Sequence, residues 1–411
     1  MGNSFFAADV SYVMKHGGWV FIAQIVTSFS AFVLSVIFSY FLPKEEFGVY
    51  KYILSMAGIL GGFSLTGLHT GIIRSTAKGK EGLFKDSFLL SMKWGLVSTC
   101  LSLFVSGYYF LNQNNILALS FIIIAICQPL LNSALLFRSF LNGKQSYRSL
   151  SSSNIIISIV SSFIIGLTVL FTKNPILIIL SYFLSNLILA ILIFSYVQKK
   201  FIPNSEHEEN EISYSKHSSL INILDIVANN IDKVILFQML GGTSVSIYTF
   251  ALAFPEQIRN VYKIIPMIAT PKFAKRPLEE IKKVFLKRTL RMFVASSILI
   301  LLYIWTAPKL YTIFFPQYTD SVMYSIVFSI TLLIEGGLSN AIFKAKQAIK
   351  EQYKVSIGSN ILKITLLIIC AFFWGLWGVI IARVISRFLG FLLSLFLTIQ
   401  LIHDPEKKNA F

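Results

Sequence analysis

The feature that most constrains this chain is its series of long apolar runs. Twelve of them are about 20 to 27 residues long, enough to cross a hydrocarbon core of about 30 Å as helix. Because 55% of the residues are hydrophobic and only 13% are charged, a soluble or disordered chain is excluded, and we predict an all-α integral membrane protein. The runs are 17–42, 48–70, 86–111, 116–138, 147–172, 175–198, 218–240, 244–270, 288–307, 320–343, 353–374 and 376–401.

The positive charge is divided unevenly between the two sides of the predicted bilayer. The net charge is +17, and the connections on one side hold 25 of the 36 Lys and Arg residues. The opposite connections hold only Lys44, Lys51, Lys173 and Lys309. Because Lys and Arg accumulate on the cytoplasmic side, we predict an even helix count with both termini in the cytoplasm. A basic nucleic-acid-binding protein would not be this apolar, so we expect no nucleic-acid partner.

The two halves of the sequence repeat each other weakly. Leu42 and Leu240 are 198 residues apart, and so are Tyr50 and Tyr248. Further matches, 206 residues apart, follow later in each half. Each pair lies in helices of the same predicted direction, so we predict a parallel duplication of six helices.

The duplication predicts two six-helix lobes, related by a parallel pseudo-twofold axis around a central cavity. The N-terminal lobe is 1–198, the cytoplasmic linker is 199–217, and the C-terminal lobe is 218–411. The linker contains four glutamates and is typical of a solvated connection. Two lobes around a cavity suit a transporter that alternates between inward-open and outward-open states.

Charged residues remain inside the predicted spans after the connections are subtracted. An ionisable side chain at a helix centre costs roughly 2.5–3.5 kcal/mol, so it usually faces water, a partner or a ligand. Seven cations face only four acids, so mutual pairing cannot neutralise them all. The cations are Lys93, Lys233, Arg259, Lys263, Lys363, Arg383 and Arg387, and the acids are Asp225, Asp232, Glu256 and Glu335.

Five of these cations, all in the second lobe, predict a cavity that receives an anionic ligand. Glu256, Arg259 and Lys263 are three and four residues apart, which places them on one helix face next to Pro255. Guanidinium groups match the geometry of phosphate oxygens particularly well. The predicted anion-binding residues are Arg259, Lys263, Lys363, Arg383 and Arg387.

The partners of these cations are left open by the sequence. Arg383 and Arg387 are four residues apart on a helix, where like charges repel unless an anion or a carboxylate lies between them. Glu335 is one candidate for that carboxylate. Asp232 and Lys233 form either part of the cavity wall or a local structural pair. Weaker candidates for the cavity lining are Asn229, Asp232, Lys233 and Asn360.

Three stretches of the sequence resemble one family. They are 41–50, which opens Phe-Leu-Pro-Lys-Glu-Glu-Phe-Gly, then 230–236, which reads Asn-Ile-Asp-Lys-Val-Ile-Leu, and 314–318, which reads Phe-Phe-Pro-Gln-Tyr. The first and third resemble helix connections of the Wzx-type polysaccharide flippases, which handle O-antigen and capsule repeat units. The second, followed by Leu240-Gly241 and Tyr248, resembles a run of the same family. That family belongs to the multidrug/oligosaccharidyl-lipid/polysaccharide exporter superfamily. Ser246 departs from the family pattern, which usually has Gly at that position.

The resemblance implies a flippase of the bacterial plasma (inner) membrane, not an enzyme. Its substrate would be an oligosaccharide repeat unit on undecaprenyl pyrophosphate, moved from the cytoplasmic to the outer leaflet among the membrane lipids. Polysaccharide polymerase and glycosyltransferases would be its partners. The sequence contains no nucleotide-binding motif and no metal-ligand spacing, so we expect no cofactor and a proton or sodium gradient as energy source. The acids expected to couple that gradient are Asp225, Glu256 and Glu335.

Two other classes remain as alternatives. A drug or organic-cation antiporter of the same superfamily should have a net acidic cavity, whereas the spans of this chain carry an excess of cations. A membrane glycosyltransferase or polymerase would need a sizeable loop with catalytic residues, and the predicted outer loops are short.

Overall fold

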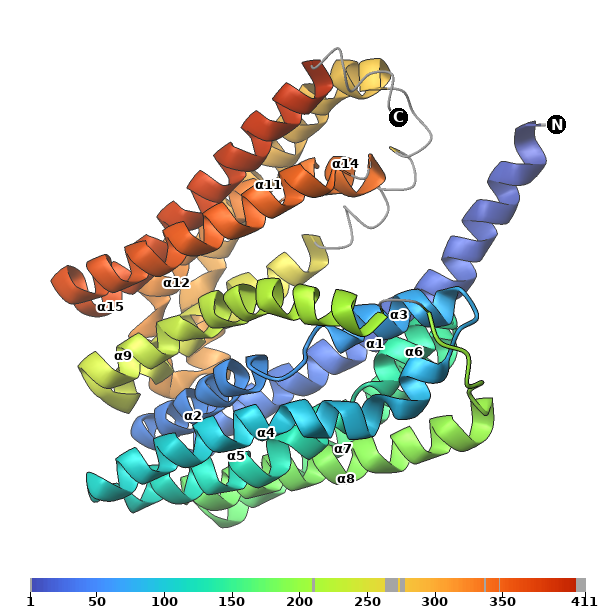
Figure 1. Cartoon of the computed structure of the whole chain (residues 1–411). Helices are drawn as coiled ribbons and strands as arrows, with labels where there is room; N and C mark the ends of the chain where they lie inside the picture. The colour runs from blue at the N-terminus through green and yellow to red at the C-terminus, as the bar shows by residue number, and fades with distance from the viewer. Residues whose placement is uncertain are drawn as a thin grey trace. The chain divides into compact units, whose positions relative to one another are not determined.

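The structure is helical throughout its described part. The residues that the computed structural model describes are 2–208, 211–262, 273, 278–335, 338–346 and 348–403. No strand occurs among them (Figure 1), so the prediction of an all-helical membrane chain is confirmed. By internal contacts the chain forms two compact units, Met1–Asn230 and Ile231–Phe411. The elements are α1 (Gly2–Phe41), α2 (Lys44–Gly62), α3 (Leu68–Ala77), α4 (Gly82–Leu111), α5 (Asn115–Ala134), α6 (Phe137–Gly143), α7 (Tyr147–Phe171), α8 (Pro175–Phe201), α9 (Glu211–Tyr262), α11 (Leu278–Phe314), η1 (Pro316–Tyr318), α12 (Ser321–Ser329), α13 (Leu332–Glu335), α14 (Ser339–Ala345) and α15 (Ile349–His403).

The helices coincide with the apolar runs of the sequence. Eight helical stretches of the described part are long and apolar enough to cross a membrane. The stretch in α15 contains the runs 353–374 and 376–401. The stretch in α9 contains the run 218–240 and the first part of the run 244–270, whose last residues lie outside the described part. The runs 48–70 and 320–343 correspond to chains of shorter helices, α2–α3 and α12–α14. The structure is therefore consistent with twelve spans as far as the described residues reach.

Unit 1 contains α1 to α8 and the beginning of α9. Its helices α4, α5, α7 and α8 lie side by side, and α1 packs on α7 (Figure 1). The core at one end is aromatic, because the rings of Phe84 and Phe140 stack with centroids 4.1 Å apart and Phe194 packs on Phe84. Buried aromatic side chains supply large apolar contact areas, which tie α4, α6 and α8 together.

The run predicted as one helix at 48–70 is two helices, so that prediction is wrong in detail. The chain leaves helical geometry after Gly62 and resumes it at Leu68. The Ser64 hydroxyl donates to the Gly61 carbonyl at 2.6 Å, which satisfies a carbonyl at the end of α2. A Cβ on Gly67 would come 1.9 Å from the Ser215 carbonyl oxygen, so only glycine permits α9 to approach here. The break therefore leaves room for another helix.

The segment predicted as a solvated linker is hydrogen-bonded to unit 1. The backbone N–H of Asn204 donates to Glu81 Oε2 at 3.2 Å. The side-chain oxygen of Asn204 accepts from the backbone N–H of Glu81 at 2.9 Å. Lys144 forms an ion pair with the same Glu81 carboxylate. Further along, a hydrogen bond from Lys78 holds the pKa of Glu208 below its usual value. Residues 202–208 are thus fixed to the turn between α3 and α4.

In unit 2 the chain reverses twice at single glycines. Gly241 in α9 has φ 77° and ψ −179°, and Gly375 in α15 has φ 54° and ψ −130°. Asp232 and Tyr248 are hydrogen-bonded across Gly241, although 16 residues of straight helix would separate them by about 24 Å. We call 211–240 the first arm of α9 and 242–262 its second arm. A glycine turn therefore brings two predicted spans side by side.

We predict that Gly241→Ala destabilises the protein. The observed φ and ψ lie in a region that is essentially restricted to glycine, so a Cβ costs about 1–3 kcal/mol. Thermal unfolding of the purified protein in detergent should show a lower Tm. Gly107→Ala is the matched control, because a Cβ there meets no atom within 4 Å and the residue is helical. Equal Tm values for the two variants would contradict the assigned role of Gly241.

Candidate functional site

A buried ion pair lies at the centre of unit 2. Asp232 on the first arm of α9 has no exposed surface, and its Oδ2 is 2.9 Å from Nη2 of Arg383 on α15. The hydroxyl of Tyr248, on the second arm, donates to the same oxygen. The Lys233 backbone N–H donates to Oδ1 at 2.9 Å. Every oxygen of this carboxylate is therefore paired, as a buried charge requires.

A second carboxylate, Glu256, gathers three arginines. Its Oε2 is 3.2 Å from Nη1 of Arg259, one turn farther along the same arm. Its Oε1 accepts a hydrogen bond from Nη2 of Arg387 and is 3.8 Å from Nη1 of Arg383. Arg387 also donates to Thr331 Oγ1 at 3.1 Å. Because Arg383 touches both acids, the two carboxylates belong to one network.

The arginines also lie against aromatic rings. The guanidinium carbon of Arg387 is 4.7 Å from the ring centroid of Phe328. That of Arg383 is 5.8 Å from the ring of Tyr248. A planar cation is stabilised over a ring face, so these contacts hold the two guanidinium groups in fixed positions.

The network has more positive than negative charge. Lys233 lies 3.8 Å from Asp232, and Lys363 on α15 lies within electrostatic range of Asp232 and Arg383. Among the described side chains of the network, five cations therefore face two carboxylates. The five are Lys233, Arg259, Lys363, Arg383 and Arg387. Such an excess in a membrane-spanning region favours the binding of an anion.

The two carboxylates differ in their access to solvent. The side chains of Asp232 and Arg383 are 0% and 9% exposed, whereas those of Glu256 and Arg259 are 28% and 30% exposed. The network therefore has a closed end, held by Asp232, and an accessible end at Glu256. A ligand that reaches the network meets the Glu256 end.

The structure places most of the predicted site residues in this network. It brings together Arg259, Lys363, Arg383 and Arg387 from the predicted anion-binding set, while Lys263 lies outside the described residues. Of the weaker candidates, Asp232 and Lys233 are members of the network. Asn360 lies one turn before Lys363 on α15.

The predicted coupling acids are distributed differently. Glu256 is at the accessible end of the network, and the side chain of Glu335 lies outside the described residues. Asp225, together with Asn229, belongs to the part of α9 that is counted with unit 1. The carboxylate between Arg383 and Arg387 is Glu256, whereas the sequence offered Glu335 as a candidate.

Two members of the network were not predicted as site residues. Tyr248 was noticed only as one half of the repeat, and Thr331 only as part of an apolar run. Tyr248 lies 16 residues from Asp232, so only the turn at Gly241 brings the two together. The sequence signal that could have identified Tyr248 is its position just after a predicted short turn.

The sequence and the fold both have relatives. A family model described as polysaccharide biosynthesis protein matches residues 13–276. The chain belongs to this polysaccharide biosynthesis protein family. The resemblance stated from the sequence is thereby confirmed at the level of the family. No curated protein sequence matches the chain.

Solved structures of transporters share the fold of this polysaccharide biosynthesis protein. The lipid II flippase MurJ in an inward closed conformation matches with a TM-score of 0.72 at 15% identity, over 96% of this chain and 89% of that chain. An inward-facing multidrug resistance MATE family transporter of the MOP superfamily matches with a TM-score of 0.68 at 14% identity, over 92% of this chain and 94% of that chain. The likeness to these transporters and flippases is therefore one of fold.

We predict that Asp232→Ala is strongly destabilising. It would leave the Arg383 guanidinium buried without its nearest carboxylate, which typically costs about 3–5 kcal/mol. The double variant Asp232→Ala/Arg383→Ala removes both charges and should recover part of the lost Tm. Thermal unfolding of the two single variants and the double variant measures this coupling. Additive losses in the double variant would show that the pair is not coupled.

Proposed function

We propose that this chain is a flippase that moves an undecaprenyl-pyrophosphate-linked oligosaccharide repeat unit from the cytoplasmic to the outer leaflet of a bacterial plasma membrane. The observation that carries the proposal is the network of five cations and two carboxylates within unit 2. A pyrophosphate group supplies the negative charge that this network lacks. The lipid tail can remain in the bilayer while the charged group passes through the protein. The family match supports a product used in polysaccharide synthesis.

Binding would proceed by exchange of one anion for another. In the empty protein the Glu256 carboxylate accepts from Arg387 and Arg259 at the accessible end of the network. A phosphate oxygen makes the same type of bidentate contact with guanidinium and carries more charge, so it displaces the carboxylate. The Asp232–Arg383 pair is buried and stays formed. The protein would thus bind the headgroup without exposing bare arginines.

Exchange also offers a route for coupling to an ion gradient. Once it is displaced from its arginines, the Glu256 carboxylate is an unpaired charge in a membrane and favours the uptake of a proton or a sodium ion. Release of the headgroup would return the carboxylate to the arginines and expel the ion. Asp225 and Glu335 are the further acids that we propose for coupling. Transport would follow alternating access of the two lobes, with both termini in the cytoplasm.

The charge of the network weighs against an organic-cation antiporter of the same superfamily. A cationic drug would meet a net positive site, and like charges in a low dielectric repel strongly. The fold likeness to MATE transporters leaves the type of substrate open, because sequence identity is only 14%. The charge of the site therefore supports an anionic substrate.

We predict that Arg259→Ala and Arg387→Ala each abolish surface polysaccharide in the native host, while the amount of protein in the membrane stays the same. Each variant removes one guanidinium contact of the Glu256 carboxylate. The matched control is Lys93→Ala, which removes an exposed intramembrane cation of α4 that lies in unit 1 and outside the network. Wild-type polysaccharide output in both arginine variants would overturn the proposal.

We predict that Glu256→Gln binds inorganic pyrophosphate more tightly than the wild type. The Kd should fall about tenfold for each 1.4 kcal/mol by which the carboxylate opposes binding of the anion. The neutral amide no longer competes for Arg259 and Arg387. The same variant should export less polysaccharide, since the carboxylate that exchanges with the headgroup is gone. Isothermal titration of the purified protein measures the first effect. Unchanged or weaker pyrophosphate binding would contradict the exchange.

A further inference from the structure

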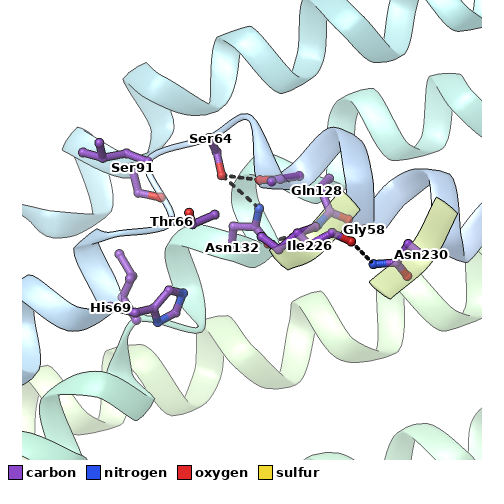
Figure 2. A pocket seen from close by; sticks show the side chains of 13 residues that line it. Gly58, Ser64, Thr66, His69, Ser91, Gln128, Asn132, Ile226 and Asn230 are labelled. Atoms are coloured by element: carbon purple, nitrogen blue, oxygen red, sulfur yellow. Dashed lines mark hydrogen bonds between the residues drawn. The ribbon is translucent and has the colours of Figure 1, made fainter. Parts of the chain in front are cut away.

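A polar pocket lies within unit 1, at the break between α2 and α3. Its volume is about 290 Å³, and its walls come from α2, α5, the α2–α3 connection and the first arm of α9 (Figure 2). Helices that are interrupted inside a membrane commonly border binding sites, because the interruption exposes polar groups. The lining residues are Gly58, Gly61, Gly62, Ser64, Leu65, Thr66, His69, Ser91, Gln128, Asn132, Leu136, Ile226 and Asn230.

The lining is polar without formal charge. Among the described lining residues there is no Asp, Glu, Lys or Arg. Gln128 donates to Asn132 at 3.1 Å, and Asn132 donates to Ser64 at 3.5 Å, so one wall is a chain of side-chain hydrogen bonds (Figure 2). Amides and hydroxyls both donate and accept, which matches the hydroxyl groups of a sugar.

One hydroxyl in the pocket has no partner. Thr66 Oγ1 is buried and makes no hydrogen bond within the protein. A buried polar group without a partner costs about 1–3 kcal/mol, so a hydrogen bond from a ligand atom in the pocket would stabilise this hydroxyl. His69 lies one turn farther along the chain and also lines the pocket. A hydrogen bond between its Nδ1 and Ser139 Oγ, 2.8 Å long, holds the imidazole ring in place.

Two glycines of α2, Gly58 and Gly61, permit the amides to approach. A Cβ on Gly61 would come 2.7 Å from Nε2 of Gln128, and a Cβ on Gly58 would come 3.2 Å from Nδ2 of Asn230. A side chain at Gly61 would therefore displace an amide of the wall. Because these glycines have no side chains, the amides of α5 and α9 can lie against α2 at the edge of the pocket.

The predicted repeat relates this pocket to the charged network. Gly58 and Glu256 are 198 residues apart, and so are Gly61 and Arg259, which is the offset of the Tyr50 and Tyr248 match. The position that carries charge in unit 2 is thus occupied by glycine in unit 1. The two units offer different chemistry at related places: an anion site in one and a neutral hydrogen-bonding site in the other.

We propose that the unit 1 pocket binds a sugar ring of the transported glycan through its hydroxyl groups. This inference rests on the proposed function, which supplies a glycan as substrate. A bare metal cation is disfavoured because the described lining contains no carboxylate. In the predicted orientation Thr66 and His69 lie in the cytoplasmic half of the span 48–70, the side on which the substrate is loaded.

The test compares binding of free sugars by the full-length protein in lipid nanodiscs. Saturation-transfer NMR with D-glucose, D-galactose, L-rhamnose and N-acetyl-D-glucosamine should give a signal for at least one sugar. We expect Thr66→Val and Gln128→Leu to reduce that signal at least threefold. The matched control is Thr168→Val, whose hydroxyl bonds only to the Ile164 carbonyl within α7, and it should bind as the wild type does.

Thr66→Val separates binding from folding. Because the Thr66 hydroxyl has no partner, its removal should leave Tm unchanged or raise it. No sugar signal in the wild type, or equal signals in the wild type and both pocket variants, would overturn the proposal. So would a sodium-dependent rise in Tm that Thr66→Val abolishes, because it would identify a cation site.

The proposed function is tested separately in the same preparations. Inorganic pyrophosphate should bind to Thr66→Val and Gln128→Leu as it does to the wild type, and should not bind to Arg387→Ala. Sugar binding without pyrophosphate binding would refute the anion site and keep the sugar pocket. Pyrophosphate binding without sugar binding would do the reverse.

Discussion

Unit 2 depends on one buried charge, the Asp232 carboxylate. A bilayer offers no water to solvate it, so the protein must supply every partner. Arg383 and Tyr248 come from different helical segments, so this single requirement draws both arms of α9 and α15 together. Arg383 then extends toward Glu256, and Arg259 and Arg387 gather around that second carboxylate. The site thus grows outward from a structural ion pair, and its accessible part can change partners while the buried part stays fixed.

The sequence predicts much of the fold and part of the site, because both predictions rest on local periodicity. Apolar runs define the spans, and the 3.6-residue period places Glu256 and Arg259 on one face. What the sequence cannot supply is contact between distant segments. The repulsion between Arg383 and Arg387 predicts an anion or a carboxylate between them, but the contact of Glu256 with both depends on how α15 meets α9. The break after Gly62 was missed for the same reason, since it serves the approach of α9 to Gly67.

The segment 202–208 is solvated, as its composition predicts, but it is also held in place. Most of its residues are exposed, and Asn204 pairs with the backbone and the carboxylate of Glu81. Glu81 is itself buried and bound to Lys144. Glu208, at the end of the segment, pairs with Arg74 and Lys78. Composition predicts the exposure of such a segment, but not the contacts that fix it.

The Glu256 carboxylate has a consequence for the resting membrane. Unpaired guanidinium groups in a membrane protein would attract chloride or phosphate and could conduct these anions across the bilayer. Such a leak would dissipate the ion gradients of the cell. Glu256 occupies the accessible end of the network with an anion that is covalently attached and cannot diffuse away. In the proposed transport cycle this tethered anion would keep small anions from the arginines, and a ligand with more negative charge than one carboxylate would displace it.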